Sequence, residues 1–422
     1  NGNLMFMTCE GCEWGGPMGG VHRLWKSNGT LPGTVPLKTF AGWPQLDIFF
    51  PPDSMDPDDY YMLGQVLKYL MPFREMVNVN GMFYFPANDG VHGVELWKSD
   101  GTAAGTLMVK DLSPGILPSM PISMAKFNDA LYFSACQLDE EMGEPQCGLW
   151  RSYGTELTTT LIRPFFLPPI SLQVVGTNLY FGGCGEYPTP DPEDYDEACG
   201  LWLSNGTPEG TLPVYSVDPD YGFPLPPLFP TTMNGMLYFS ACWPHSFLED
   251  SGTCAVWQSN GTAMGTHPVM PSSPYGPAFS YPPTFLTPLD GRLYFNACDS
   301  YDTTPAPCYL YEFDPAIPWG WNTIWPAWYG DWPPEDGYGM GFLSPFVFGP
   351  SWMTAFGGDL FFGGCSWDGG LYDCGLWQVP FSKGYYDAYP IDYKWPSGYE
   401  LPFWPAYQLT PLNGRIYFGA GS

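Results

Sequence analysis

Basic residues are the scarcest feature of this 422-residue chain. It holds 14 Lys and Arg against 43 Asp and Glu, which gives a formal net charge of −29. Nucleic acids and anionic membrane surfaces bind through clustered basic side chains, so this balance argues against both as partners. The sequence also lacks any apolar run of about 18 residues, the length that a membrane-spanning helix needs. We therefore expect no nucleic-acid partner and no membrane span.

Histidine and charged residues in general are also few. The four His are scattered, and no second Cys-x-x-Cys accompanies Cys9 and Cys12, so a zinc site is not expected. Charged residues make up only 14% of the chain while Gly and Pro number 51 and 49, which excludes a fold dominated by long solvent-facing helices. Hydrophobic residues at 45% argue against disorder. The chain begins Asn1-Gly2-Asn3 without an initiator Met, which indicates a processed or partial chain.

What the sequence does contain is a repeated pair of short elements. The first ends in a marker phenylalanine at Phe6, Phe85, Phe133, Phe181, Phe239, Phe295, Phe362 and Phe418. The second follows every copy but the last and reads Leu24-Trp25, Leu96-Trp97, Leu149-Trp150, Leu201-Trp202, Val256-Trp257, Leu310-Tyr311 and Leu376-Trp377. Most repeats carry Asn-Gly or Asp-Gly pairs, which supply the left-handed residues of tight hairpins.

Each repeat divides into four short strands. In the second repeat we predict strands at 75–79, 82–85, 95–98 and 106–110. Four antiparallel strands in roughly 50 residues are typical of a propeller blade. We therefore predict an all-β fold, a β-propeller of seven four-stranded blades closed by the N- and C-terminal strands. It would form one domain over 1–422 with loop insertions at about 44–72 and 312–350. Stacked hairpins and two sandwiches are the alternatives.

A family resemblance supports this interpretation. Residues 95–106 read ELWKSDGTAAGT, which resembles the ELWxxDGTxxGT repeat of hyalin-like secreted or cell-surface propeller proteins. The match is complete in the second repeat, partial in the first, third, fourth and fifth, and weak in the last two. The resemblance implies an extracellular or cell-surface propeller and no particular reaction.

The twelve cysteines follow the same repeat. Six, Cys9 among them, lie three residues after a marker Phe, and five lie two residues before the second element. Adjacent antiparallel strands bring such positions together, so we predict the disulfides Cys136–Cys147, Cys184–Cys199, Cys242–Cys254, Cys298–Cys308 and Cys365–Cys374. The second repeat lacks both partners. In the first repeat, Cys9 occupies the position after the marker Phe, but His22 occupies the position before the second element. We therefore predict a Cys9–Cys12 disulfide, with a redox-active pair of cysteines as the alternative.

Three turns contain an N-glycosylation sequence. Asn28, Asn205 and Asn260 each begin an Asn-Gly-Thr triplet at the hairpin turn. They are glycosylated in a eukaryotic secretory host, or Asn merely replaces Asp as a turn former. Asp100 at the equivalent position of the second repeat leaves both interpretations open.

Acidic loops are the only candidate metal sites. They lie at Asp53–Asp59, Asp191–Glu197, Asp218–Asp220 and Asp299–Asp302. Solvated loops and calcium sites are both consistent with this pattern. None of the four loops shows the residue spacing of an EF-hand. In the first insertion, Asp56 and Pro57 followed by leucines at helical spacing predict a helix start. We expect no cofactor, with calcium as the one alternative.

Two apolar segments are candidate contact surfaces. The second insertion gathers tryptophans that would bind glycans, form an assembly interface, or pack on the insertion itself: Trp319, Trp321, Trp325, Trp328 and Trp332. At the C-terminus, giving residues 406–412 to the first blade would close the propeller. That leaves 415–419, with Ile416, Tyr417 and Phe418, as a spare strand that could add to another molecule.

The sequence shows no nucleophile elbow, metal-binding His pair or phosphate loop, and nothing singles out a carboxylate pair. We therefore expect a non-enzymatic extracellular glycoprotein that self-associates into a homopolymer, such as a filament, sheath or surface layer. The alternative is a glycan- or protein-binding propeller module. A carboxylate-based glycan-cleaving enzyme is the third hypothesis.

Overall fold

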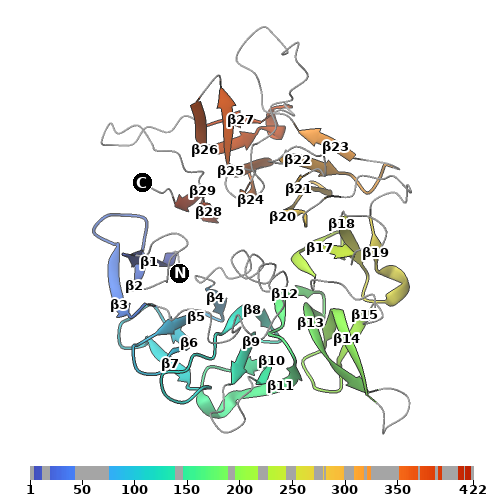
Figure 1. Cartoon of the computed structure of the whole chain (residues 1–422). Helices are drawn as coiled ribbons and strands as arrows, with labels where there is room; N and C mark the ends of the chain where they lie inside the picture. Colours follow the sequence, from blue (N-terminus) through green and yellow to red (C-terminus); the bar gives the residue numbers. More distant parts are fainter. Residues whose placement is uncertain are drawn as a thin grey trace. The chain divides into compact units, whose positions relative to one another are not determined.

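A computed structural model describes most of the repeats and part of their connections. The described residues are 4–11, 20–42, 76–137, 146–188, 195–216, 227–243, 253–269, 279, 282–298, 308–317, 321–324, 351–368, 371–384, 388–391, 407–412 and 414–419. The chain divides into two compact units, Asn1–Asp220 and Tyr221–Ser422. The expected single domain over 1–422 therefore stays a prediction, and each unit is described by itself (Figure 1).

The first unit holds four antiparallel sheets in chain order. Blade 1 consists of β1 (Leu4–Glu10), β2 (Val21–Ser27) and β3 (Val35–Phe40). Blade 2 consists of β4 (Val77–Val79), β5 (Met82–Asn88), β6 (Val94–Ser99) and β7 (Leu107–Lys110). Blade 3 consists of β8 (Ile122–Phe127), β9 (Ala130–Gln137), β10 (Gln146–Ser152) and β11 (Thr159–Phe165). Blade 4 consists of β12 (Ile170–Val175), β13 (Asn178–Pro188), β14 (Tyr195–Ser204) and β15 (Thr211–Ser216).

The second unit repeats this plan. Blade 5 consists of β16 (Leu228–Met233), β17 (Met236–Trp243), β18 (Thr253–Ser259) and β19 (His267–Pro268). Blade 6 consists of β20 (Thr284–Leu289), β21 (Arg292–Cys298), β22 (Cys308–Phe313) and β23 (Trp321–Ile324). Blade 7 consists of β24 (Ser351–Phe356), β25 (Asp359–Asp368), β26 (Leu371–Val379) and β27 (Tyr389–Pro390). A final hairpin pairs β28 (Tyr407–Leu412) with β29 (Arg415–Gly419).

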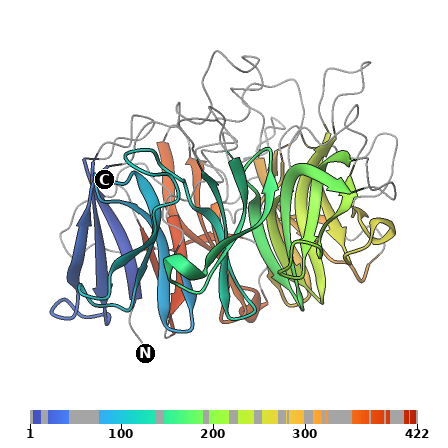
Figure 2. The same cartoon turned by 90° about the horizontal axis from the view of Figure 1, so that it is seen from below.

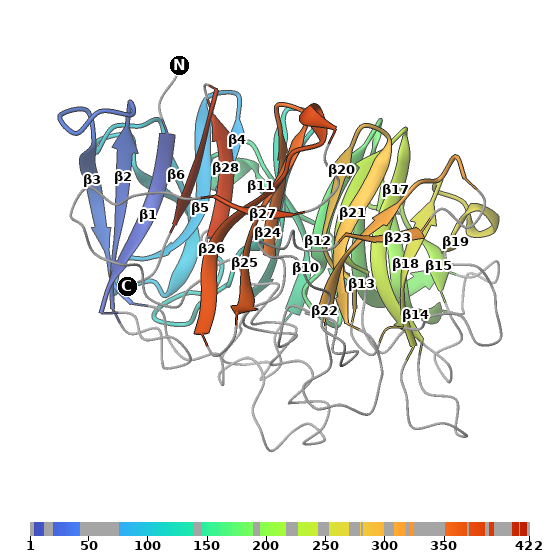
Figure 3. The same ribbon diagram turned by 90° about the horizontal axis from the view of Figure 1, so that it is seen from above.

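The repeat predicted from the sequence sets the strand register. In each blade the marker Phe stands directly opposite the aromatic residue of the second element, as Phe133 opposite Trp150 and Phe295 opposite Tyr311. First strands of successive sheets contact one another within each unit, from β4 to β8 to β12 and from β16 to β20 to β24 to β28. Figures 2 and 3 show the strands of neighbouring sheets running alongside one another in each unit. The predicted all-β propeller of four-stranded sheets is confirmed.

The core lies between successive blades. Leu96 of blade 2 packs with Phe133 and Trp150 of blade 3, and all three are at most 5% exposed. Leu149 of blade 3 packs in the same way with Trp202 of blade 4. Burying side chains of this size stabilises the fold by about 1.5–3 kcal/mol each. The Leu-Trp element is therefore the packing unit, because its two residues serve adjacent interfaces.

The Asp-Gly-Thr turn is built by its own side chains. In blade 2, Asp100 Oδ1 accepts the Thr102 backbone N–H at 2.9 Å and the Thr102 hydroxyl at 2.7 Å. Thr102 Oγ1 in turn accepts the Gly105 N–H at 2.9 Å. A Cβ on Gly105 would lie 2.1 Å from Asp100 Oδ1, so the second glycine of the motif leaves room for the aspartate. Asn28, Asn205 and Asn260 accept the same two bonds from their threonines.

The turn also docks on the preceding blade. The Lys98 ammonium of blade 2 donates to the Gly154 carbonyl of blade 3 at 2.6 Å. A Cβ on Gly154 would meet the Tyr84 hydroxyl at 2.4 Å. Tyr132 donates in the same way to the Gly206 carbonyl of blade 4 at 3.4 Å. The turn glycine is therefore required by the neighbouring blade as well as by its own hairpin.

The ends of the propeller depart from the regular pattern. Blade 1 has three strands among the described residues, and β28 pairs with β29 in a sheet of two. The expected pairing of residues 406–412 with blade 1 is not among the described pairings, so closure by the terminal strands stays a prediction. Residues 415–419, which we expected to be spare, form β29 within their own hairpin.

Candidate functional site

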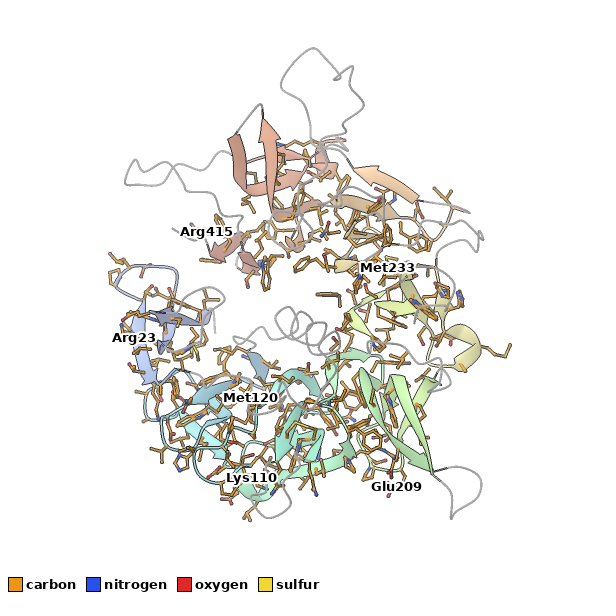
Figure 4. All side chains as sticks on the ribbon, in the orientation of Figure 1. Arg23, Lys110, Met120, Glu209, Met233 and Arg415 are labelled. Carbon is orange, nitrogen blue, oxygen red and sulfur yellow. A yellow bond between two sulfur atoms is a disulfide. The ribbon has the colours of Figure 1, made fainter. Side chains whose placement is uncertain are left out.

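Three aromatic side chains follow one another along the first strands of the second unit. Phe229 lies on β16, Phe285 on β20 and Trp352 on β24. Ring centroids are 5.8 Å apart from Phe229 to Phe285 and 5.7 Å apart from Phe285 to Trp352, and both pairs are tilted by 44°. All three side chains are half-buried. We call these residues the aromatic row; β16, on which it begins, ends at Met233, which Figure 4 labels.

The backbone aims each ring through a β-bulge. The register of β16 against β17 shifts between Leu228 and Thr231, so three steps on the first strand match two on its partner. The same shift occurs on β20 and β24. The bulged residues take left-handed conformations, with φ of 49° at Phe229, 58° at Phe285 and 52° at Trp352. Such a conformation costs about 1–3 kcal/mol for a bulky residue, and bulges of this kind re-aim a side chain.

The first unit has the same bulge without the aromatics. Ser123 and Ser171 occupy the equivalent places with φ of 47° and 59°, and the Ser123 hydroxyl accepts the Ser171 N–H at 3.0 Å. The bulge is therefore a property of the fold, whereas aromatic rings at it are particular to the second unit. Sequence reasoning missed the row, although each member stands ten residues before a marker Phe. Aligning the repeats on that marker would have revealed the position.

Hydroxyl groups accompany the rings. Each ring is followed two residues later by a threonine, namely Thr231, Thr287 and Thr354. The Thr287 hydroxyl donates to the Phe285 carbonyl at 2.8 Å, which ties it to the bulge. Strands β16, β20 and β24 carry no charged residue. Flat apolar rings beside neutral hydroxyls suit an uncharged ligand with both apolar faces and polar edges.

The cysteines lie where the repeat predicts them. Cys136 and Cys147 form a disulfide, and Cys184 and Cys254 are also disulfide-bonded. The remaining predicted pairs stand directly opposite each other in the strand register: Cys184 and Cys199, Cys242 and Cys254, Cys298 and Cys308, and Cys365 and Cys374. In blade 1, Cys9 stands opposite His22 and is itself disulfide-bonded. Cys12 lies outside the described residues, so Cys9–Cys12 stays a prediction.

The three candidate glycosylation residues lie at exposed turns. Asn28, Asn205 and Asn260 are exposed, and each uses Oδ1 in the turn. Asp100 forms the same turn in blade 2. The structure thus shows why either residue makes the turn, and both interpretations of the triplets remain predictions.

Most other candidates lie outside the described residues. These are Trp319, Trp325, Trp328, Trp332, the helix start at Asp56, and the acidic loops, apart from 195–197 at the start of β14. Trp321 is on β23 opposite Phe313. Ile416, Tyr417 and Phe418 are half-buried on β29, which pairs with β28, and their contact with another molecule stays a prediction. Across the described ranges, no group of three His, Cys, Asp or Glu residues could hold a metal, and no helix is long and apolar enough to cross a membrane.

One charged cluster was not predicted and serves packing. On blade 6, Arg292 contacts Glu312 and Asp314 at 3.2 Å each. Glu312 also accepts the Tyr294 hydroxyl at 3.0 Å. Burial, together with the neighbouring Glu312 charge, raises the pKa of Tyr294 well above its ordinary value. This arrangement keeps the tyrosine a hydrogen-bond donor and offers no nucleophile.

Similarity to known proteins is confined to solved structures. No family model matches the sequence, and no curated protein matches it. The chain is similar to Pyrococcus horikoshii acylaminoacyl peptidase at 9% identity and a TM-score of 0.43, covering 93% of this chain and about half, 51%, of that one. It is also similar to the β-propeller domain of the Trilobed protease from Pyrococcus furiosus, at 8% identity and a TM-score of 0.40, covering 76% and 82% of the two chains. A third is Penicillium chrysogenum α-L-arabinanase complexed with arabinobiose, at 13% identity and a TM-score of 0.33, covering 65% and 83%.

The comparisons with solved structures correct two expectations. The similar solved structures include peptidases and glycoside hydrolases, whereas the sequence led us to expect a non-enzymatic assembly subunit. Both the structural-subunit interpretation and the expectation that the chain is not an enzyme were wrong on this finding. The absence of a catalytic motif does not identify a scaffold protein, because a catalytic arrangement is recognised by its geometry and not by its sequence positions.

Proposed function

We propose that this chain is an extracellular propeller that recognises carbohydrate through the aromatic row. The observation that carries the proposal is the row itself, three half-buried rings on consecutive first strands, each at a strained bulge and each followed by a threonine. The apolar faces of sugar rings stack on flat aromatic side chains, and sugar hydroxyls bond to neutral polar groups at the edge. Strained bulky residues persist where function requires them.

Charge favours carbohydrate of a particular kind. The chain has a net charge of −29, and β16, β20 and β24 contribute no charged side chain. Acidic ligands are repelled by such a protein, and no cation on these strands would offset the repulsion. Neutral glycans are therefore the favoured class.

An extracellular location is part of the proposal. It is supported by the Cys136–Cys147 disulfide and the bonded Cys9, Cys184 and Cys254, because such bonds persist in oxidising compartments. The resemblance to ELWxxDGTxxGT proteins supports the same location.

Binding of the whole chain to an array of neutral and acidic glycans tests the function, followed by calorimetry with the strongest ligand. We expect Phe285→Ser, which installs the residue type of the first unit, to weaken binding at least about tenfold, or about 1.4 kcal/mol. Phe166→Ser is the matched control, because Phe166 is an aromatic residue 49% exposed and outside the row. Release of reducing ends from the bound glycan, measured in the same samples, reports whether binding leads to cleavage. An array without neutral-glycan binding, or equal affinity of Phe285→Ser and the unaltered chain, would refute the proposal.

A further inference from the structure

The geometry of the aromatic row points to the size and form of its ligand. The two centroid distances, 5.8 and 5.7 Å, are nearly equal, and the tilt between successive rings is 44° in both pairs. Nearly equal spacings and equal interplanar angles make the row a repeating platform. A ligand that contacts all of it must itself repeat, because a single compact group can stack on one ring only.

The direction of the row also matters. Its members come from three consecutive sheets whose first strands contact in succession, so the row crosses the strands and does not follow one of them. The hydroxyl groups recur with it, since Thr231, Thr287 and Thr354 each lie two residues after a ring. Thr231 and Thr354 are half-buried, whereas Thr287 is buried and its hydroxyl donates to the Phe285 carbonyl. The rings therefore recur along the whole row, and polar contacts are available to a ligand beside its first and last members.

We infer that the aromatic row binds an extended, uncharged oligosaccharide across at least three successive sugar units, in preference to a terminal sugar. This inference rests on the proposed function and adds the ligand's length and charge to it. A linear glycan supplies the repeat that the rings require, with one ring face and one set of hydroxyls in each unit. An extended peptide would offer amide groups and varied side chains, which a row without charges or varied pockets does not match.

A length series tests the inference. Glucan, xylan, mannan and arabinan oligosaccharides of one to six units are titrated into the whole chain by calorimetry. For the backbone that binds, we expect affinity to rise about tenfold or more from one unit to three and then to level off. In Phe229→Ser or Trp352→Ser, which remove an end of the row, the plateau should come one unit earlier. In Phe285→Ser the gain with length should be lost, because the two remaining rings are no longer adjacent.

The outcomes separate the inference from the proposed function. A single sugar that binds as tightly as a trisaccharide, or a plateau unmoved by either end variant, overturns the inference and leaves carbohydrate binding in place. A uronic-acid oligosaccharide that binds as tightly as the neutral one of equal length overturns the assignment of charge. Failure of every oligosaccharide to bind, or tighter binding of a proline-rich peptide that Phe285→Ser abolishes, overturns both. Circular dichroism of each variant, expected to be unchanged, shows that the fold is intact.

Discussion

The carboxyl of Glu95 on β6 holds Ser119 through two hydrogen bonds, from the Ser119 backbone N–H at 3.0 Å and from its hydroxyl at 2.5 Å. It also accepts the Leu112 N–H at 3.1 Å. The side chain is fully buried, and it fixes the segment between β7 and β8 on blade 2. Blade 2 has no cysteine at either position of the repeat, where Asn88 stands opposite Val94.

Glu95 makes stability depend on pH. Burial raises the pKa of its carboxyl from 4.5 to about 8, against the opposing effect of its hydrogen bonds to Ser119 and Leu112. Between these values the folded chain keeps a proton that the unfolded chain releases. The free energy of unfolding should therefore fall as pH rises from about 4.5 to about 8, by up to about 1.4 kcal/mol per pH unit from this group.

Glu95→Gln should flatten that dependence, because its amide stays neutral throughout. Glu156→Gln, at an exposed position, is the control and should retain the slope. Thermal unfolding followed at several pH values gives the comparison. Equal slopes for Glu95→Gln and the unaltered chain would show that Glu95 is ionised in the folded state.

Gly105→Ala should destabilise blade 2, because its Cβ would lie 2.1 Å from Asp100 Oδ1. We expect a loss of about 1–3 kcal/mol in the free energy of unfolding. In an Asp100→Ala background the same change should cost clearly less, since the clashing oxygens are gone. Denaturant unfolding of the four chains of this double-mutant cycle measures the coupling. Strict additivity would place the source of the destabilisation elsewhere.

The Cys136–Cys147 disulfide closes a loop between positions 11 residues apart. Replacing both cysteines by alanine should lower the free energy of unfolding by about 2–3 kcal/mol. Peptide mapping without reduction should also find Cys184–Cys199, Cys242–Cys254, Cys298–Cys308 and Cys365–Cys374. Peptides that link cysteines of different blades would contradict the register seen in β13–β14 and its equivalents.

The Asn-Gly-Thr turns permit a clean test of glycosylation. When the chain is secreted from a eukaryotic host, removal of N-glycans should lower the mass of the peptides that contain Asn28, Asn205 and Asn260. Asn205→Asp should lose the glycan while keeping the turn, because Asp100 makes the same two bonds in blade 2. Asn205→Ala should lose the glycan and about 1–3 kcal/mol of stability, because it removes two hydrogen bonds of about 0.5–1.5 kcal/mol each. Unmodified peptides at all three sites would leave only the turn-former interpretation.

The sequence predicted what depends on the repeat, and missed what depends on contacts between blades. The marker Phe, the Leu-Trp pair and the cysteines recur at fixed offsets, so their register could be derived, and Cys136 indeed bonds to Cys147. Glu95 belongs to the recognised ELW segment, yet its partner Ser119 is 24 residues away in a connection without a repeat. Phe285 stands at a fixed offset from its marker Phe295, but its left-handed backbone and its ring contacts to other blades could not be read from that offset.

The docking of each turn on the preceding blade limits how such a protein can change by exchanging its repeats. At the place of the turn glycine, blade 7 has Phe381, whose ring lies 5.1 Å from that of Tyr294 on blade 6. Tyr294 meanwhile donates its hydroxyl to Glu312 of its own blade. A transplanted blade would therefore fit only where the tyrosine of the preceding blade is placed to contact the residue at its turn. Duplication or loss of repeats in this architecture should accordingly preserve neighbouring pairs such as blades 6 and 7.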